Sequence, residues 1–239
     1  MMDKQHVLYE WIQGKTYEEV WDYQTSLHQS LIDIKRGLTG HIKSEEIKVV
    51  HHLLLCQHNP VYTLGKSGST SNLLSGEEVL KAQGVEFFKI NRGGDITYHG
   101  PGQITGYPIF DLDYFYTDVH RYVRELEEVI IQVLKEYKIK GVRIPKYTGV
   151  WIEDNVVEGS FRKICAIGVH LSRWVTLHGF AFNVNTELSY FNQIIPCGIQ
   201  ENHLTVTSLE NELGKKVDLK EVEEWLKLKF ERIFNIEYI

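Results

Sequence analysis

Residues 92–103 read Arg92-Gly93-Gly94-Asp95-Ile96-Thr97-Tyr98-His99-Gly100-Pro101-Gly102-Gln103, the most informative stretch of this chain. Four glycines and one proline stand among these twelve residues. Because glycine has no Cβ and tolerates positive φ, a loop of this composition brings its backbone close to a ligand. The polar side chains spaced through it then face that ligand. The stretch predicts a ligand-binding loop, with a plain Gly/Pro-rich surface turn as the alternative.

Apolar, β-favouring runs stand on both sides of this loop. Residues 85–90 lead into it as a strand, and residues 104–110 follow it as the next strand. Further strands are predicted at residues 49–56, 61–64, 149–152, 163–171 and 176–183, of which the last two form a hairpin.

Helix signals are interspersed with these strands. Thr16-Tyr17-Glu18-Glu19 is typical of a capping box, and similar starts stand at residues 75–78 and 218–221. Apolar residues at helical spacing predict a long helix over residues 119–137, ended by Gly141. Because helices and strands do not alternate strictly, we predict an α+β fold with a mixed or antiparallel sheet flanked by helices.

Length and charge exclude several classes of protein. The 239 residues show no linker, repeat or low-complexity segment, so we expect residues 1–239 to form a single domain. A net charge of −6 argues against general binding to nucleic acid. No run of 18 apolar residues indicates a membrane span, and the polar amino-terminal residues do not resemble a signal peptide. We therefore expect a cytoplasmic protein without membrane partners.

Three cysteines, Cys56, Cys165 and Cys197, include no Cys-x-x-Cys pair, so neither a disulfide framework nor a zinc site is expected. Cys56 stands in an apolar run and is interpreted as a buried hydrophobic residue. Cys197 follows Pro196 and precedes Gly198, which predicts a constrained turn. It is either a nucleophile or a buried structural thiol.

Lys163 opens an otherwise apolar strand. A lysine near a thiol favours the thiolate, although most lysines are solvated surface charges. Strict two-residue alternation would place Lys163, Cys165 and Ile167 on one face of the strand. Cys165 is therefore the rival of Cys197 for the reactive thiol.

Three segments together resemble the lipoyl(octanoyl) transferase family. They are residues 92–103, Lys163-Ile164-Cys165-Ala166-Ile167-Gly168, and Pro196-Cys197-Gly198-Ile199. Their order and separations also agree with the family, from the first helix to about Leu209. The resemblance implies a fold shared with biotin and lipoate protein ligases.

The family resemblance also implies roles for single residues. Cys197 would be acylated, and Lys163 would take its proton and then manage the proton of the incoming amine. His99 would line the active site, although a loop histidine that only packs is the alternative. Substrate would contact Arg92, Gly93, Gly94, Asp95, Ile96, Thr97, Tyr98 and His99 in the loop, and Ala166, Ile167, Gly168, Gly179, Phe180 and Ala181 on the acyl-binding strands. Small residues on those strands equally suit close packing of the backbone.

The implied reaction takes an octanoyl group from octanoyl-acyl carrier protein. It passes the group to a lysine of a lipoyl domain, as in 2-oxoacid dehydrogenase subunits or the glycine cleavage H protein. No cofactor or metal is expected, because a thioester needs no activation by ATP before it forms an amide. Acidic carriers would need a local basic patch, for which the candidates are Arg121, Arg124, Arg143, Lys146, Arg162 and Arg173.

Two other functions stay open: an ATP-dependent lipoate or biotin protein ligase on the same fold, and a non-catalytic module that binds acyl groups. Two apparent motifs are rejected. Leu64-Gly65-Lys66-Ser67 resembles the end of a phosphate-binding loop, but Pro60 stands where that motif needs glycine. His51, His52 and His58 lack the spacing of a metal site and are interpreted as neutral strand histidines.

Overall fold

The computed structural model describes residues 4–38, 49–154, 156–195 and 203–239. Over these residues a nine-stranded sheet has the order β12-β1-β2-β6-β10-β9-β8-β7, with β11 paired to β9, and a second sheet has the order β4-β3-β5. The large sheet comprises β1 (Gln5–Ile12), β2 (His51–Cys56), β6 (Gln103–Ile109), β7 (Gly141–Ile144), β8 (Tyr147–Glu153), β9 (Phe161–Ser172), β10 (Val175–Asn183), β11 (Leu204–Val206) and β12 (Ile236–Tyr238). The small sheet comprises β3 (Val61–Leu64), β4 (Glu86–Lys89) and β5 (Ile96–His99).

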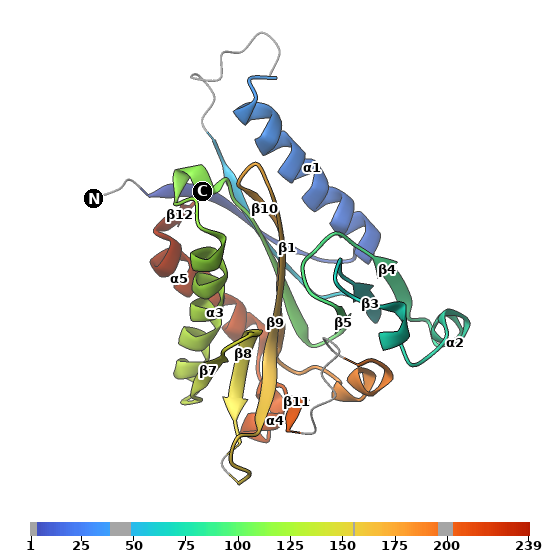
Figure 1. Cartoon of the computed structure of the whole chain (residues 1–239). Coiled ribbons are helices and arrows are strands. Elements are labelled where there is room, and N and C mark those ends of the chain that lie inside the picture. The colour runs from blue at the N-terminus through green and yellow to red at the C-terminus, as the bar shows by residue number, and fades with distance from the viewer. Residues whose placement is uncertain (1–3, 39–48, 155, 196–202) are drawn as a thin grey trace.

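The helices are α1 (Tyr17–Lys35), α2 (Glu77–Ala82), α3 (Val119–Glu136), α4 (Leu209–Leu213) and α5 (Leu219–Phe234), with 3-10 turns η2 (Thr70–Asn72), η3 (Leu112–Tyr114) and η4 (Leu188–Gln193). In the large sheet, α3 and α5 cover one face and α1 lies against the other (Figure 1). Both parallel and antiparallel pairs occur, such as β1 with β2 and β9 with β10. The predicted α+β fold with a mixed sheet is confirmed.

Two of the three capping predictions are confirmed, whereas α2 begins after Gly76, which makes no side-chain capping bond. Thr16 Oγ1 accepts from the Glu19 N–H at 3.2 Å, and Glu19 Oε2 accepts from the Thr16 N–H at 2.7 Å, so both halves of the capping box form. The Asp218 side chain caps α5 by accepting from Lys220 N–H. None of the helices in the described segments is long and apolar enough to cross a membrane.

Two local predictions are wrong. Gly141 does not end the long helix: α3 stops at Glu136, Lys138 takes the positive φ of 59°, and Gly141 begins β7. A Cβ at Gly141 would lie 2.8 Å from Leu134 Cδ1, so this glycine allows β7 to pack closely on α3. Residues 92–103 are not a loop throughout, because residues 96–99 form β5, which pairs with β3.

The small sheet and the turn after β3 hold the glycine-rich segment in place through backbone hydrogen bonds. Gly65 N–H donates to Asp95 O at 3.1 Å and Lys66 N–H donates to Arg92 O at 2.9 Å. The turn after β3 therefore lies directly under residues 92–95, which we call the Arg92 loop. Residues 64–67, which superficially resemble a phosphate-binding motif, thus contact the Arg92 loop through their backbone.

Candidate active site

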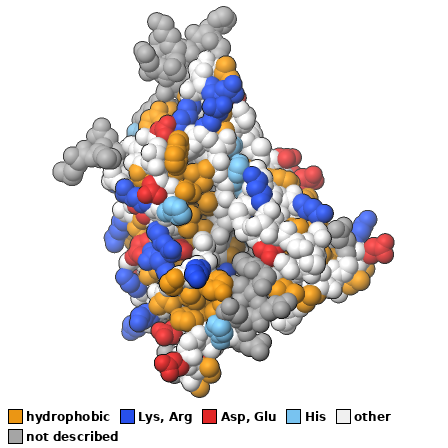
Figure 2. Space-filling model, in the orientation of Figure 1, with side chains coloured by type: hydrophobic (Ala, Val, Ile, Leu, Met, Phe, Trp, Pro, Cys, Tyr) orange, Lys and Arg blue, Asp and Glu red, His pale blue; other side chains and the backbone are white. Residues whose placement is uncertain are grey.

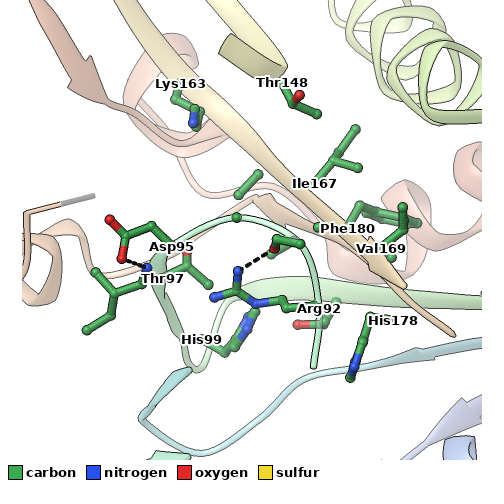
Figure 3. A pocket seen from close by; sticks show the side chains of 18 of the residues that line it. Arg92, Asp95, Thr97, His99, Thr148, Lys163, Ile167, Val169, His178 and Phe180 are labelled. Carbon is green, nitrogen blue, oxygen red and sulfur yellow. Dashed lines mark hydrogen bonds between the residues drawn. The ribbon is translucent and has the colours of Figure 1, made fainter. Parts of the chain in front are cut away.

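A cavity of about 430 Å³ lies where the Arg92 loop, β5, β6, β9 and β10 meet (Figure 3). Such a volume is within the usual range for small-molecule sites. Figure 3 shows Lys163 across the cavity from the Arg92 loop, with Ile167 and Phe180 on the neighbouring strands. Tyr17, the first residue of α1, also lines the cavity.

Buried hydrogen bonds fix the Arg92 loop. The guanidinium of Arg92 donates from Nη2 to Thr63 O at 2.6 Å and to Thr63 Oγ1 at 3.0 Å, and from Nη1 to Gly93 O at 3.0 Å. Asp95 Oδ1 accepts from Ile96 N–H at 2.7 Å. Because charged groups make the stronger hydrogen bonds in proteins, these contacts hold the loop in one shape.

Glycine lets this loop lie against β9. Gly93 N–H donates to Val169 O at 2.9 Å, and a Cβ on Gly168 would lie 2.8 Å from Gly93 O. Gly94 adopts a φ of +83°, in the region that favours glycine. The approach predicted from the glycine content is thus seen as contact between two backbones.

His99 is a neutral imidazole with a defined tautomer. Gln103 donates both protons of its amide, to Tyr98 O and to Asn183 Oδ1, so Gln103 Oε1 must accept from His99 Nδ1 at 2.8 Å. The pKa of His99 is lowered to about 4, mainly by burial and also by nearby Arg92, while the hydrogen bond to Gln103 acts in the opposite direction. His99 Nε2, 3.3 Å from Thr63 Oγ1, is then an acceptor at the cavity wall.

This polar network continues to the strand that carries Lys163. Asn183 donates from Nδ2 to Thr207 O at 3.0 Å. Thr207 N–H in turn donates to Lys163 O at 2.9 Å. The histidine and the lysine are therefore fixed relative to each other through hydrogen bonds between buried groups.

Lys163 lines the cavity, but not on the face that alternation predicted. The register of β8 against β9 shifts between Val150, which pairs with Cys165, and Trp151, which pairs with Lys163. The extra residue in β9 is Ile164, and this bulge turns Lys163 to the face opposite Cys165. The ammonium of Lys163 lies 4.5 Å from the centre of the Trp151 ring, a cation–π contact.

The same bulge removes Cys165 from the site. Its side chain is fully buried in the cluster under α3 and α5, among Val150, Ile164 and Phe182. Burial raises the pKa of the Cys165 thiol, which disfavours a thiolate. The predicted shared face of Lys163 and Cys165 is therefore wrong, and Cys165 is a core residue.

Most of the other predicted site residues come together. The cavity is lined by Arg92, Gly93, Gly94, Asp95, Ile96, Thr97, His99, Lys163, Ala166, Ile167, Gly168, Gly179, Phe180 and Ala181. Tyr98 lies on the other side of β5, where its ring stacks on Tyr190 at 4.6 Å between centroids. Its hydroxyphenyl group supports the small sheet. Cys197 lies outside the described residues.

The structure adds residues that sequence reasoning missed. His178 lines the cavity with a φ of +62°, an unusual value for a residue inside a strand. Its Nε2 lies 2.7 Å from Asn91 Oδ1 and therefore carries the proton. Burial and nearby Arg92 lower its pKa to about 3, so it is neutral. The pair His178-Gly179 inside an otherwise apolar strand was the sequence feature that could have indicated this cavity residue.

Four of the six candidate basic residues pair with carboxylates. Arg121, Arg124, Arg143 and Arg162 do so at 2.9, 2.6, 2.9 and 2.9 Å to Glu125, Glu127, Glu127 and Glu212. Lys146 lines the cavity, and Arg173 takes a positive φ of 52° between β9 and β10. A basic patch for a carrier protein stays a prediction.

Fold and cavity together define an α+β protein with a small-molecule site. A crystal structure of lipoate-protein ligase A bound with ATP superposes with a TM-score of 0.67 at 14% identity, covering 99% of this chain and 87% of that one. At this identity the likeness concerns the fold alone.

The sequence itself is much closer to other proteins. The model of the lipoyl protein ligase A/B catalytic domain matches residues 16–231, and the chain belongs to this family. An octanoyltransferase of Christiangramia forsetii is 52% identical over 93% of both chains. One of Flavobacterium psychrophilum is 51% identical over 94% of this chain and 95% of its own. These similarities favour acyl transfer of octanoyl groups in protein lipoylation over ATP-dependent ligation.

Proposed function

We propose that this chain, as one catalytic domain over residues 1–239, moves an octanoyl group through a thioester on Cys197. The donor is octanoyl-acyl carrier protein. The acceptor is a lysine of a lipoyl domain, in 2-oxoacid dehydrogenase subunits or the glycine cleavage H protein, and we place the reaction in the cytoplasm. The observation that carries the proposal is Lys163 beside a narrow slot floored by Ala166, Gly168 and Ala181.

The first step forms the acyl-enzyme. Lys163 takes the proton of the Cys197 thiol, and the thiolate attacks the carbonyl carbon of the donor thioester. The carbon–sulfur bond to the donor breaks, and the released thiolate of the carrier takes the proton from Lys163. One thioester replaces another, so the step is close to balanced and uses no ATP.

The second step delivers the group. The amine of the acceptor lysine attacks the Cys197 thioester and loses a proton to Lys163. The carbon–sulfur bond breaks, the amide forms, and the Cys197 thiolate regains a proton from Lys163. An amide is more stable than a thioester, so this step drives the reaction.

The walls of the cavity suit an acyl chain with a polar head. Small side chains on β9 and β10 leave a slot beside Phe180 and Ile167. Backbone N–H groups of the Arg92 loop other than that of Gly93, which bonds Val169 O, would stabilise a developing oxyanion, and the neutral His99 offers an acceptor at the same wall. A straight, unbranched chain of medium length fits these surroundings.

Intact-mass measurement tests the proposal. The chain is mixed with octanoyl-acyl carrier protein in the absence of ATP, and we expect a mass increase of one octanoyl group that hydroxylamine removes. Cys197→Ala should carry no adduct, whereas Cys165→Ala should still be acylated. Modification of a lipoyl domain only from free octanoate and ATP, unaffected by Cys197→Ala, would contradict it and indicate a ligase.

A further inference from the structure

The edge of β9 is open beside the cavity. Residues 161–165 of β9 lie along β8, and the pairing ends at Cys165, which lies opposite Val150. Residues 166–172 pair with β10 on one side. On the other side, within the described part of the chain, the backbone donor that reaches them is Gly93 N–H, which bonds Val169 O at 2.9 Å. A seven-residue strand edge is thus mostly unpaired there.

The direction of the backbone groups follows from that one contact. In an antiparallel pair, residues two apart direct their N–H and C=O groups to the same side. Because Val169 directs its carbonyl to Gly93, Ile167 and Leu171 direct theirs away from β10 as well. The edge therefore offers the N–H groups of Ile167, Val169 and Leu171 and the carbonyl groups of Ile167 and Leu171, while the Val169 carbonyl already accepts from Gly93.

The side chains on this edge are apolar and accessible. Ile167, Val169 and Leu171 are half-buried and pack only partly against the core under α3. Figure 2 shows hydrophobic side chains gathered along this face of the molecule, with Lys and Arg side chains beside them. Proteins usually protect open edges with lysine or proline, and residues 166–172 contain neither.

The edge is continuous with the active site. Ile167 and Val169 line the cavity that also holds Lys163. Whatever binds along this edge therefore lies at the mouth of the cavity.

We propose that residues 167–171 of β9 bind an extended segment of the acceptor protein by strand addition, an inference that rests on the proposed function. Reach selects the acceptor over the donor. A lysine side chain extends only about 6 Å from its Cα, so the acceptor backbone must lie at the cavity mouth. The donor carries its acyl group on a long phosphopantetheine arm and can dock farther away. Main-chain pairing then supplies affinity, and side-chain pockets supply specificity.

Charge agrees with this choice. The exposed side of α3 next to the edge carries His120, Arg121 and Arg124, and Lys146 stands at the cavity rim. Part of this charge is balanced by Glu125 and Glu127. The remaining field favours an acceptor segment with acidic residues around its lysine.

Hydrogen exchange tests the contact directly. The full chain is mixed with a lipoyl domain whose target lysine is replaced by arginine, and exchange is followed by mass spectrometry. We expect the lipoyl domain to slow exchange of the amides of Ile167, Val169 and Leu171. Acyl carrier protein should not slow the exchange of these amides. Protection confined to other segments, or protection that grows with enzyme concentration alone as a second copy would give, overturns the proposal.

Variants at Leu171, which does not line the cavity, separate docking from chemistry. Leu171→Pro removes an outward N–H, and Leu171→Glu places a negative charge on the edge, while Leu171→Ala keeps the backbone group. Acylation of Cys197 by octanoyl-pantetheine should be unchanged in all three. Transfer to the lipoyl domain should show a KM raised about tenfold in the first two, the scale of one or two lost hydrogen bonds.

The two half-reactions make the outcomes distinct. Unchanged transfer in both Leu171→Pro and Leu171→Glu overturns the docking proposal and leaves the proposed function intact. Absence of an acyl-enzyme in the unmodified chain would instead overturn the proposed function. If Leu171→Pro alone loses acylation through misfolding, Leu171→Glu and the exchange experiment decide the question.

Discussion

The two long walls of the cavity are held in place by different means. The wall made by the Arg92 loop depends on side chains. The Arg92 guanidinium donates to Thr63 O, and the Asp95 carboxylate accepts from Ile96 N–H. The wall made by β9 and β10 depends on backbone register, because the bulge at Ile164 decides where Lys163 points. Residue identity specifies the first wall, and strand pairing specifies the second.

This difference decides how each wall responds to mutation. Changes in the loop wall should act by loss of particular polar contacts. Changes in the strand wall should act by displacing the backbone. A single added carbon should therefore lower stability strongly wherever two backbones are in contact.

The largest effect is expected at Lys163, which stands on the strand wall. Lys163→Ala should lower the rate of octanoyl transfer by about 10²–10⁴-fold, the usual contribution of a general acid–base group. Stopped-time assays of lipoyl-domain octanoylation measure this rate. Lys220→Ala, at an exposed position of α5 outside the cavity lining, is the matched control and should keep most of the activity. A Lys163→Ala protein with nearly normal rate would show that another group moves the proton.

A smaller but still large effect is expected where the walls touch. Gly168→Ala would place a Cβ 2.8 Å from Gly93 O and push the Arg92 loop off β9. We expect a loss of about 1–3 kcal/mol in the free energy of unfolding, measured with urea, and a higher KM for the donor. Gly76→Ala, whose Cβ would meet nothing within 4 Å, should leave both quantities unchanged. Equal behaviour of the two variants would contradict the close contact.

The sequence was more informative about the loop wall than about the strand wall. Arg92, Thr97 and His99 were predicted as cavity residues and line it, because glycine and proline mark such a segment in any context. Lys163 was placed on the face of Cys165 because alternation is all that a single strand reveals. The bulge at Ile164 depends on the pairing with β8, which no local pattern contains.

Non-local pairing also explains the other omissions. His178 reaches the cavity through a left-handed backbone conformation in the middle of β10, where it pairs with Val169 of β9. Helix starts such as Thr16, in contrast, were located correctly, because a capping box is complete within four residues. The fold class followed from such local signals, whereas the exact lining of the site required the assembled sheet.

Loss of one hydroxyl probes the loop wall more gently. Thr63→Val keeps the shape of the residue but removes the Oγ1 that accepts from Arg92 and lies 3.3 Å from His99 Nε2. Leaving these buried groups short of a partner should cost about 1–3 kcal/mol of unfolding free energy. Thr205→Val, on an exposed position of β11, is the control and should change it little. Chemical denaturation of both variants would show whether Thr63 anchors the loop.

The smallest effect expected is the share of the pH-dependent stability that His99 contributes to the loop wall. Burial lowers the pKa of His99 from its ordinary 6.5 to about 4, so the unfolded chain binds a proton that the folded chain excludes between these values. Stability should therefore be full above pH 6.5 and fall as the pH is lowered towards 4, by about 1 kcal/mol at pH 5.5. His99→Gln should reduce the slope of unfolding free energy against pH in that interval, and His51, His58 and His178, whose pKa values burial also lowers, supply the remaining slope. An unchanged slope in His99→Gln would mean that the loop wall does not hold its histidine neutral.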